Sequence, residues 1–196
     1  MTKELIQKTL VILKPDIVKR GLIGEIINRF EKAGLKIVAL KMLWMTREQA
    51  ELFYPSSEDW YISVGMKTIT RYKEMGLDPK KEFGTEDPLY IGKRVKEWLV
   101  DFITSGPIVA MVLEGVNAVE VVRKLVGPTE PAKAPPGTIR GDYSHMSIAY
   151  ANWNKIALRN VVHASENEEE AKREISIIFK PTEIYEYRRD IEEVIY

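Results

Sequence analysis

The chain has only two histidines, His145 and His163, so each can be considered as a catalytic candidate. Cysteine is absent. The lack of cysteine excludes disulfides, thiolate metal sites and cysteine nucleophiles. His163 lies near the end of a short expected strand and two residues before an expected helix N-cap, a position that favours an anion. The same position also suits a structural histidine at a strand end.

Glu174 is the second residue with a chemical signal. It follows Ala171 by three positions and precedes Ile175, so it shares the apolar stripe of the expected last helix. A carboxylate on such a stripe needs a partner, because burying it alone is costly. His163 at the head of the same helix is a natural partner, and the pairing would fix the ring's tautomer and leave its other nitrogen free to attack. A Lys or Arg at the edge of the stripe is the alternative partner.

Two cations extend this pattern. Arg140 lies in the Pro- and Gly-rich loop Thr129 to Asp142, where a planar guanidinium could bind phosphate oxygens in pairs. A loop arginine such as Arg140 is, however, usually just solvated surface. Lys14 precedes Pro15 at the end of an apolar strand, where a sheet often displays functional groups, although lysine also commonly ends strands. The Gly-rich P-loop, the protein-kinase motifs and G-x-G-x-x-G are all missing. A phosphoryl-transfer enzyme would therefore need a different phosphate site.

The elements that must position these side chains can be read from the apolar spacing. Ile23, Ile26, Ile27 and Phe30 predict a helix that ends at Gly34. Further helices are expected from Thr46 with Gln49 towards Tyr54, from Asn117 with Glu120 to Gly127, and from Ser165 with Glu168 to Ile178, each opened by a capping pattern. Strands are expected at Lys8 to Lys14, Leu35 to Met45, Gly106 to Gly115 and Asn160 to Ala164. This order predicts an α+β sandwich, a sheet with helices on one face.

Two stretches interrupt that order, Ser56 to Ile91 and Ser144 to Leu158. Each could be a lid, an oligomer contact or a decoration. We expect one domain over residues 1–196, with insertions at about 56–91 and 144–158.

Composition excludes several classes of protein. The 196 residues include 29 Lys and Arg and 29 Asp and Glu, so no net field attracts a polyanion. Apolar residues make up 45 % and charged residues 30 %, as in folded soluble proteins. No apolar run approaches a membrane span and no signal-peptide pattern opens the chain, so we expect a cytoplasmic protein.

Four segments resemble the nucleoside diphosphate kinase family: Lys8 to Glu25, Ser105 to Gly115, Pro136 to Asp142 and Asn160 to Ser165. They occur in the family's order across the whole chain, apart from the two interruptions. The resemblance implies a ferredoxin-like βαββαβ sandwich with a four-stranded antiparallel sheet. It also implies reversible ping-pong transfer of the γ-phosphoryl from a nucleoside triphosphate to a diphosphate through a phosphohistidine.

By this resemblance His163 carries the phosphoryl group, Glu174 orients it, and Tyr54 lies near the ring. Ser165 would cap the last helix and place a hydrogen bond near the imidazole. The residues expected to bind the nucleotide are Lys14, Val95, Arg123, Thr129, Arg140 and Asn160. Mg²⁺ would be held mainly by the nucleotide phosphates, with no protein metal ligands. The family also implies a homo-oligomer, a hexamer or a tetramer built from dimers.

Three departures from the family pattern concern the base more than the phosphates. Val95 stands where the family usually has an aromatic residue that stacks on the base. Glu166 replaces the commoner aspartate, and the insertion at 144–158 displaces the apolar position that covers the base's other face. Two other hypotheses remain: an RNA-binding module on a ferredoxin-like sheet, and a catalytically idle homologue kept as a scaffold. The aliphatic strands and zero net charge disfavour the first, and the complete residue set disfavours the second.

Overall fold

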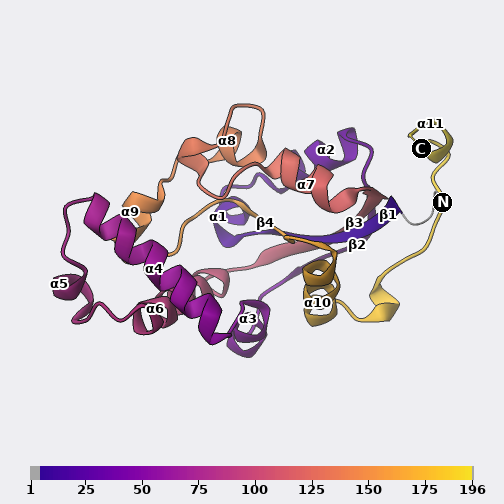
Figure 1. The fold of residues 1–196 in the computed structure, drawn as a ribbon. Coiled ribbons are helices and arrows are strands. Elements are labelled where there is room, and N and C mark those ends of the chain that lie inside the picture. The colour runs from indigo at the N-terminus through magenta and orange to yellow at the C-terminus, as the bar shows by residue number, and fades with distance from the viewer. Residues whose placement is uncertain (1–4, 196) are drawn as a thin grey trace.

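The centre of the molecule is a four-stranded antiparallel sheet (Figure 1). The computed structural model describes residues 5–195, so residues 1–4 and 196 of the domain expected over 1–196 lie outside it. The strands are β1 (Ile6–Leu13), β2 (Lys36–Leu43), β3 (Ile108–Val116) and β4 (Val162–Ala164). They lie in the order β2-β3-β1-β4, and each neighbouring pair is antiparallel. This topology confirms the ferredoxin-like α+β fold.

Helices cover both faces of the sheet. They are α1 (Pro15–Lys19), α2 (Ile23–Lys32), α3 (Arg47–Phe53), α4 (Glu58–Glu74), α5 (Pro79–Phe83), α6 (Pro88–Ile103), α7 (Ala118–Val126), α8 (Ile139–Tyr143), α9 (Ile148–Trp153), α10 (Glu168–Ile178) and α11 (Glu192–Ile195). Along β1, Val11 and Leu13 pack with α1, α2, α7 and α8, whereas Leu10 and Ile12 pack with α3, α6 and α10. The expectation of helices on one face was therefore wrong. Strands buried on both faces read as continuous apolar runs, which is the pattern of β1 and β3.

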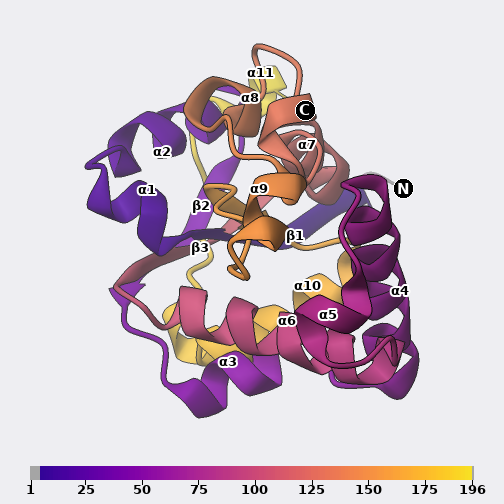
Figure 2. The same ribbon diagram turned by 90° about the vertical axis from the view of Figure 1, so that its left-hand side faces the viewer.

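The two interrupting stretches are helical. Within residues 56–91 lie α4, α5 and the start of α6, and within 144–158 lies α9. Figure 2 shows α4 and α6 forming one side of the molecule, with α9 between them and the α7–α8 side. The α4 and α6 backbones approach closely: a Cβ added at Gly65 would lie 1.9 Å from the Pro88 carbonyl oxygen, and one at Gly92 would lie 2.0 Å from that of Tyr61. These glycines allow the two helices to pack as a pair.

The helix ends bear out some of the expected caps and contradict others. Thr46 and Gln49 form the expected capping box of α3. Asn117 stands at the start of α7 with φ +48° and without a side-chain cap. Asn167, rather than Ser165, caps α10 by accepting a hydrogen bond from the Glu170 amide. Ser165 is instead fully buried, and its hydroxyl donates to Glu174.

Candidate active site

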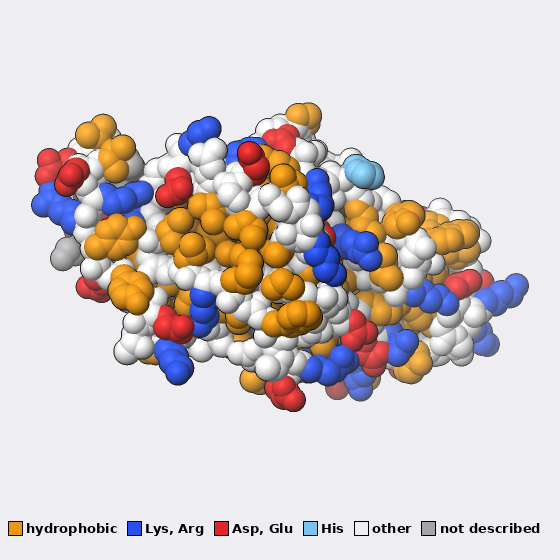
Figure 3. Space-filling model, turned by 180° about the vertical axis from the view of Figure 1, so that it is seen from behind, with side chains coloured by type: hydrophobic (Ala, Val, Ile, Leu, Met, Phe, Trp, Pro, Cys, Tyr) orange, Lys and Arg blue, Asp and Glu red, His pale blue; other side chains and the backbone are white. Residues whose placement is uncertain are grey.

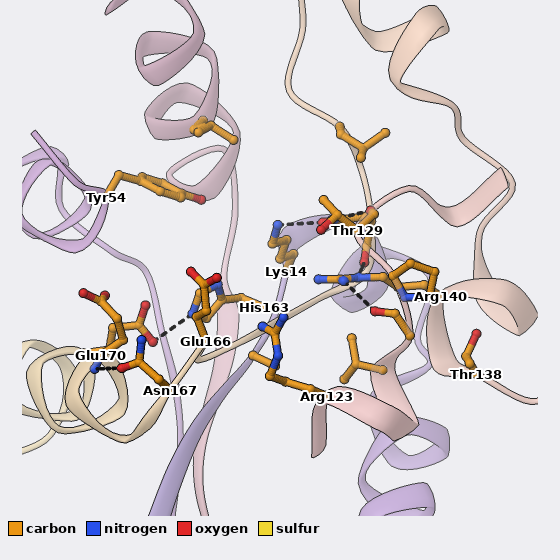
Figure 4. Close-up of a pocket in the computed structure, with 18 of the residues that line it drawn as sticks. Lys14, Tyr54, Arg123, Thr129, Thr138, Arg140, His163, Glu166, Asn167 and Glu170 are labelled. Carbon is orange, nitrogen blue, oxygen red and sulfur yellow. Dashed lines mark hydrogen bonds and ion pairs between the residues drawn. The ribbon is translucent and has the colours of Figure 1, made fainter. Parts of the chain in front are cut away.

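A cavity of about 850 Å³ opens beside His163, at one end of the central strands (Figure 4). Polar residues from the ends of β1 and β4, from α7 and α10, from the end of α3 and from the loops around α8 converge on it, and Arg140, expected in a loop, lies on α8 itself. Of the predicted site residues, the cavity is lined by Lys14, Tyr54, Arg123, Thr129, Arg140, Asn160, His163 and Glu174. Val95 is the one predicted site residue that does not line it.

His163 and Glu174 form the predicted pair. His163 Nε2 lies 2.9 Å from Glu174 Oε2, and the Ser165 hydroxyl donates to the same oxygen over 2.6 Å. Burial alone would raise the pKa of the Glu174 carboxyl, but the hydrogen bonds from His163 and Ser165 lower it overall. An ionised carboxylate only accepts, so Nε2 carries the proton and Nδ1 keeps its lone pair. The ring's side chain is 23 % exposed, so a ligand can reach it.

Aromatic side chains enclose the ring on the α3 side. The Phe53 ring meets the His163 ring edge to face, with centroids 4.9 Å apart. Tyr54 follows at the end of α3, and burial together with the negative charge of Glu174 raises the pKa of its phenol. Tyr54 therefore stays a neutral hydroxyl. Figure 4 shows it at the cavity wall.

Lys14 and Asn160 link the two sides of the cavity. Lys14 Nζ donates to Asn160 Oδ1 over 2.7 Å, and Asn160 Nδ2 donates to the Thr129 carbonyl over 3.0 Å. Burial, followed by the nearby charge of Arg140, lowers the pKa of Lys14 to about 8, although Asp16 acts in the opposite direction. The lysine is only 7 % exposed, so an anion in the cavity would stabilise its charge.

A strained turn places these groups. Val161 has φ +71°, and the amide of Val162 donates to the Asn160 carbonyl over 2.7 Å, which closes a three-residue γ-turn. Such a conformation costs about 1–3 kcal/mol and persists only when surrounding contacts enforce it. The Val161 carbonyl accepts from the Lys14 amide over 2.9 Å, and the Val161 amide donates to Asp16 Oδ2 over 3.1 Å. The turn is therefore fixed by the same segment that carries Lys14.

Arg140 is held from three directions. Its guanidinium donates to the carbonyls of Asn160, Gly127 and Val162, over 3.3, 2.9 and 2.8 Å. Burial, followed by the charge of Arg123, lowers the pKa of Arg140 to about 10. Gly141 permits this position, since a Cβ there would lie 2.3 Å from the Pro135 carbonyl oxygen. Lys14, Arg123 and Arg140 thus form a partly desolvated cationic cluster suited to a polyanion.

The family model described as nucleoside diphosphate kinase matches residues 7–66 and 88–184. The chain belongs to the nucleoside diphosphate kinase family. It is therefore an enzyme of the phosphotransferase class. The part of the chain that the family model does not match between its two segments, residues 67–87, covers the end of α4 and all of α5.

Three solved structures are similar to this chain. The NDP kinase from Pyrobaculum aerophilum is 55 % identical, with a TM-score of 0.90, and the match covers 92 % of this chain and 100 % of that one. The enzyme from Borrelia burgdorferi, a transition-state mimic with bound vanadate and ADP, is 42 % identical, with a TM-score of 0.77 and 96 % of each chain covered. The enzyme from Halobacterium salinarum, in complex with CDP, is 34 % identical, with a TM-score of 0.66, covering 97 % of this chain and 98 % of that one.

Relative to the family pattern, the base side of the site differs most. Val95 lies on α6 and lines a neighbouring cavity of about 580 Å³, together with residues of α4 and α9. Glu166 lines the cavity that holds His163. The other histidine, His145, is exposed and does not line either cavity.

Sequence reasoning missed two parts of the site. Asp16, which holds the Val161 amide, lies two residues after Lys14, and that spacing was the available signal. Leu99 and Trp60 also line the His163 cavity, but nothing in their local sequence distinguishes them from core residues. Among residues 5–195, no cluster of three or more His, Cys, Asp or Glu could hold a metal ion. No helix in the same range is both long and apolar enough to cross a membrane.

Proposed function

We propose that the chain transfers the γ-phosphoryl group of a nucleoside triphosphate to a nucleoside diphosphate through phosphorylated His163. The observation that carries this proposal is the hydrogen bond between His163 Nε2 and Glu174, which leaves Nδ1 unprotonated beside three cationic side chains. The Nδ1 lone pair forms a bond to the γ-phosphorus, while the bond from that phosphorus to the β–γ bridging oxygen breaks. The electron pair leaves with the diphosphate, and Glu174 keeps the Nε2 proton in place.

The reverse half-reaction uses the same atoms. A second diphosphate enters the cavity, its terminal oxygen attacks the phosphorus on Nδ1, and the N–P bond breaks. An unprotonated Nδ1 is the leaving group, which is the state that Glu174 maintains. Donor and acceptor therefore occupy the same site in turn, which is a ping-pong order.

The cationic cluster supplies the electrostatics. Phosphoryl transfer asks a protein mainly to align the reactants and to neutralise spreading charge. Lys14 and Arg140 would contact the phosphates nearest to His163, and Arg123 on α7 would contact the remaining phosphate. Thr129 would also contact phosphate, and Asn160 would reach the sugar and the transferring end. Tyr54, as a neutral phenol, would donate a hydrogen bond near the ring.

Mg²⁺ fits this site only as an ion carried by the nucleotide. The acidic residues in the cavity wall lie on the α10 side, and Glu174 is already committed to His163 and Ser165. An oxygen-preferring cation would therefore take phosphate oxygens and water as ligands. When bound, it would neutralise part of the phosphate charge.

The RNA-binding hypothesis requires an open sheet face with exposed aromatic side chains. Such modules stack bases on aromatics exposed on the open face of the sheet. Here helices cover both faces of the sheet formed by the described residues, and the central strands are aliphatic. The idle-homologue hypothesis would leave a strained turn and desolvated cations without a function to maintain them.

Assembly and location are also proposals. Strand β2 is at the edge of the sheet, and the side chains of Leu40 and Met42, with Trp44 just beyond, are exposed. Figure 3 shows apolar side chains gathered over the middle of the face seen from behind. Exposed apolar surface of this kind supports a homo-oligomer, which the family resemblance implies as a hexamer or a tetramer of dimers. We also propose a cytoplasmic enzyme that acts as one domain with two helical insertions.

The test uses a γ-labelled nucleoside triphosphate with Mg²⁺. The wild-type chain should acquire an acid-labile, base-stable label and pass it to a diphosphate of a different base. His163→Ala should abolish both steps, whereas His145→Ala should leave them unchanged. Stable labelling of the His163→Ala protein would show that another residue is the nucleophile.

A further inference from the structure

The end of α3 forms the part of the cavity wall that packs against the His163 ring. Phe53 meets the imidazole with ring centroids 4.9 Å apart, and Tyr54 lines the same cavity. The last carbonyls of a helix have no partner within it, and they form the negative end of its dipole. The last turn of α3, which lies wholly within the described residues 5–195, has no basic residue of its own. A cation from another element can therefore satisfy these carbonyls.

Arg173 on α10 is that cation. Its Nη1 donates to the Leu52 carbonyl and its Nη2 to the Phe53 carbonyl, each over 3.1 Å. Glu170, one turn earlier on α10, accepts from Nε over 3.2 Å and from Nη2 over 2.6 Å. An arginine fork that bonds two successive carbonyls fixes their orientation more closely than a single rotatable donor does.

The bond to Phe53 acts on the peptide group that leads into Tyr54. The carbonyl of this peptide accepts from Arg173, and its N–H, which belongs to Tyr54, donates to the Ala50 carbonyl over 3.1 Å. At Tyr54 the chain leaves the helix, with ψ at 139°. Both polar atoms of the peptide are thus held where the Tyr54 side chain turns toward the cavity (Figure 4). The orientation of the phenol therefore depends on an arginine that does not itself line the cavity.

The same guanidinium lies beside the acidic partner of the ring. Arg173 Nη2 is 3.8 Å from Glu174 Oε1, the carboxylate oxygen that bonds neither His163 nor Ser165. Burial raises the pKa of the Glu174 carboxyl, the hydrogen bond from His163 opposes this most strongly, and the charge of Arg173 adds to the net lowering. Arg173 therefore lies against both the carboxylate that orients the imidazole and the helix end that encloses it.

We propose, resting on the phosphoryl transfer through His163 proposed above, that Arg173 is a positioning residue that holds the end of α3, and with it the Tyr54 phenol, against the His163–Glu174 pair. Arg173 does not touch the nucleotide. It acts on the chemical step, because a displacement of about 1 Å in an aligned group can cost about 100-fold in rate.

The experiment measures phosphoenzyme formation after rapid mixing with Mg²⁺ and either ATP or ribose 5-triphosphate, which has no base. The maximal rate and the half-saturating donor concentration are obtained separately. Arg173→Met removes all the donors and keeps much of the side chain's length. Arg94→Met on α6 is the matched control, because Arg94 is also partly exposed and pairs with a glutamate three residues away, Glu97. Thermal unfolding is followed for each variant.

Arg173→Met should lower the maximal rate about 5- to 50-fold, equally for both donors, and change the half-saturating concentration less than about twofold. Arg94→Met should change neither quantity by more than about twofold, because exposed ion pairs contribute little. The loss should also depend on the phenol. On a Tyr54→Phe background, which lacks the hydroxyl, Arg173→Met should cost only about twofold, since residues that act as a unit are not additive.

A second variant keeps the proposal testable if Arg173→Met folds poorly. Arg173→Lys retains a charge but not the planar fork, and it should lose about two- to fivefold in maximal rate, again chiefly when Tyr54 is present.

Three results would overturn the proposal. Equal losses with Tyr54 and with Phe at that position would show that Arg173 does not act through the phenol. A loss in half-saturating concentration alone, or one confined to ATP, would place its action on nucleotide binding. Rates equal to those of Arg94→Met would remove the positioning role altogether. If the wild-type chain forms no phosphoenzyme, the proposed kinase function itself is refuted, whereas a labelled wild type with an unaffected Arg173→Met refutes this inference alone.

Discussion

The two ends of the proposed nucleotide site are built on different principles. The phosphate end comes from the ends of the central strands, from α8 and from the loops beside it, and its side chains Lys14, Arg140, Asn160 and His163 each have a fixed partner. The base end, which is the cavity lined by Val95, comes from α4, α6 and α9, and its wall is mostly apolar apart from polar side chains on α4. The comparison suggests that charge is handled by a rigid, prearranged framework, while base contact is left to a surface with few directional demands.

The two ends also carry different stability costs. At the phosphate end, buried cations and a β-branched residue with positive φ are held in place by the surrounding hydrogen bonds. At the base end, stability depends on two glycines that let α4 and α6 touch. Changes at the first end should therefore affect every nucleotide alike, and changes at the second should affect the base alone.

The largest effect should come from Glu174→Gln at the phosphate end. Gln cannot hold the proton on Nε2 by charge, so more of the imidazole population should have a protonated Nδ1 that cannot attack. We expect kcat/KM to fall on the order of 10- to 1000-fold, equally for all bases and for ribose 5-triphosphate. Steady-state kinetics with each donor measure this.

The matched control for that change is Glu170→Gln. Glu170 lies on the same helix and lines the same cavity, but pairs with Arg173 rather than His163. The kcat/KM of Glu170→Gln should fall by less than about threefold, because partly exposed ion pairs contribute little. A base-dependent loss in Glu174→Gln would break the division between the two ends.

An intermediate effect should come from Gly92→Ala at the base end. A methyl group there meets the Tyr61 carbonyl, so α4 and α6 must separate at a cost of about 1–3 kcal/mol. Gly24→Ala on α2 is the control, since nothing lies within 4 Å of its Cβ, and it should stabilise by about 0.4–1 kcal/mol. Chemical denaturation measures both changes.

Steady-state kinetics should also separate Gly92→Ala from its control, Gly24→Ala. Gly92→Ala should raise KM for nucleotides while kcat/KM for ribose 5-triphosphate stays within about twofold, because the sheet and His163 are not displaced. An equal loss for the base-free donor would mean that the helical pair also supports the phosphate end.

The phosphate end was predictable because its signals are local or follow strictly from the fold. His163, Arg140 and Lys14 occur in short motifs, and the spacing of Glu174 from Ala171 already placed it on a buried stripe. The predicted contact between Glu174 and His163 is confirmed. Ser165 shows the limit: its capping pattern was genuine, but burial against Glu174 gave the hydroxyl another partner, and Asn167 became the cap.

The base end was not predictable to the same degree. Whether residues 56–91 form a lid or a helical pair depends on Gly65 meeting Pro88 and Gly92 meeting Tyr61, and no local pattern encodes these contacts. Val95 was assigned from the family position alone, and the structure places it in the second cavity.

The smallest effect on activity should come from pH, through Lys14. Its pKa of about 8 means that the lysine loses its charge as pH rises through that value, so KM for triphosphates should rise about two- to tenfold between pH 7 and 9. The rise should be the same for every base and absent in Lys14→Met, which has a high KM throughout. A rise confined to one base would place the titrating group at the base end.

The same group should affect stability with the opposite sign. Lys14 has its ordinary pKa of 10.5 in the unfolded chain and about 8 in the fold, so the unfolded chain binds more protons between these values. The contribution of Lys14 to the free energy of unfolding should therefore increase from pH 8 to 10.5, on the order of 2–3 kcal/mol, as the buried charge disappears. Denaturation of the ligand-free wild type and Lys14→Met across this range gives the difference in slope. If the slopes coincide, the lysine is not desolvated, and the rigid, charge-committed phosphate end loses its main physical support.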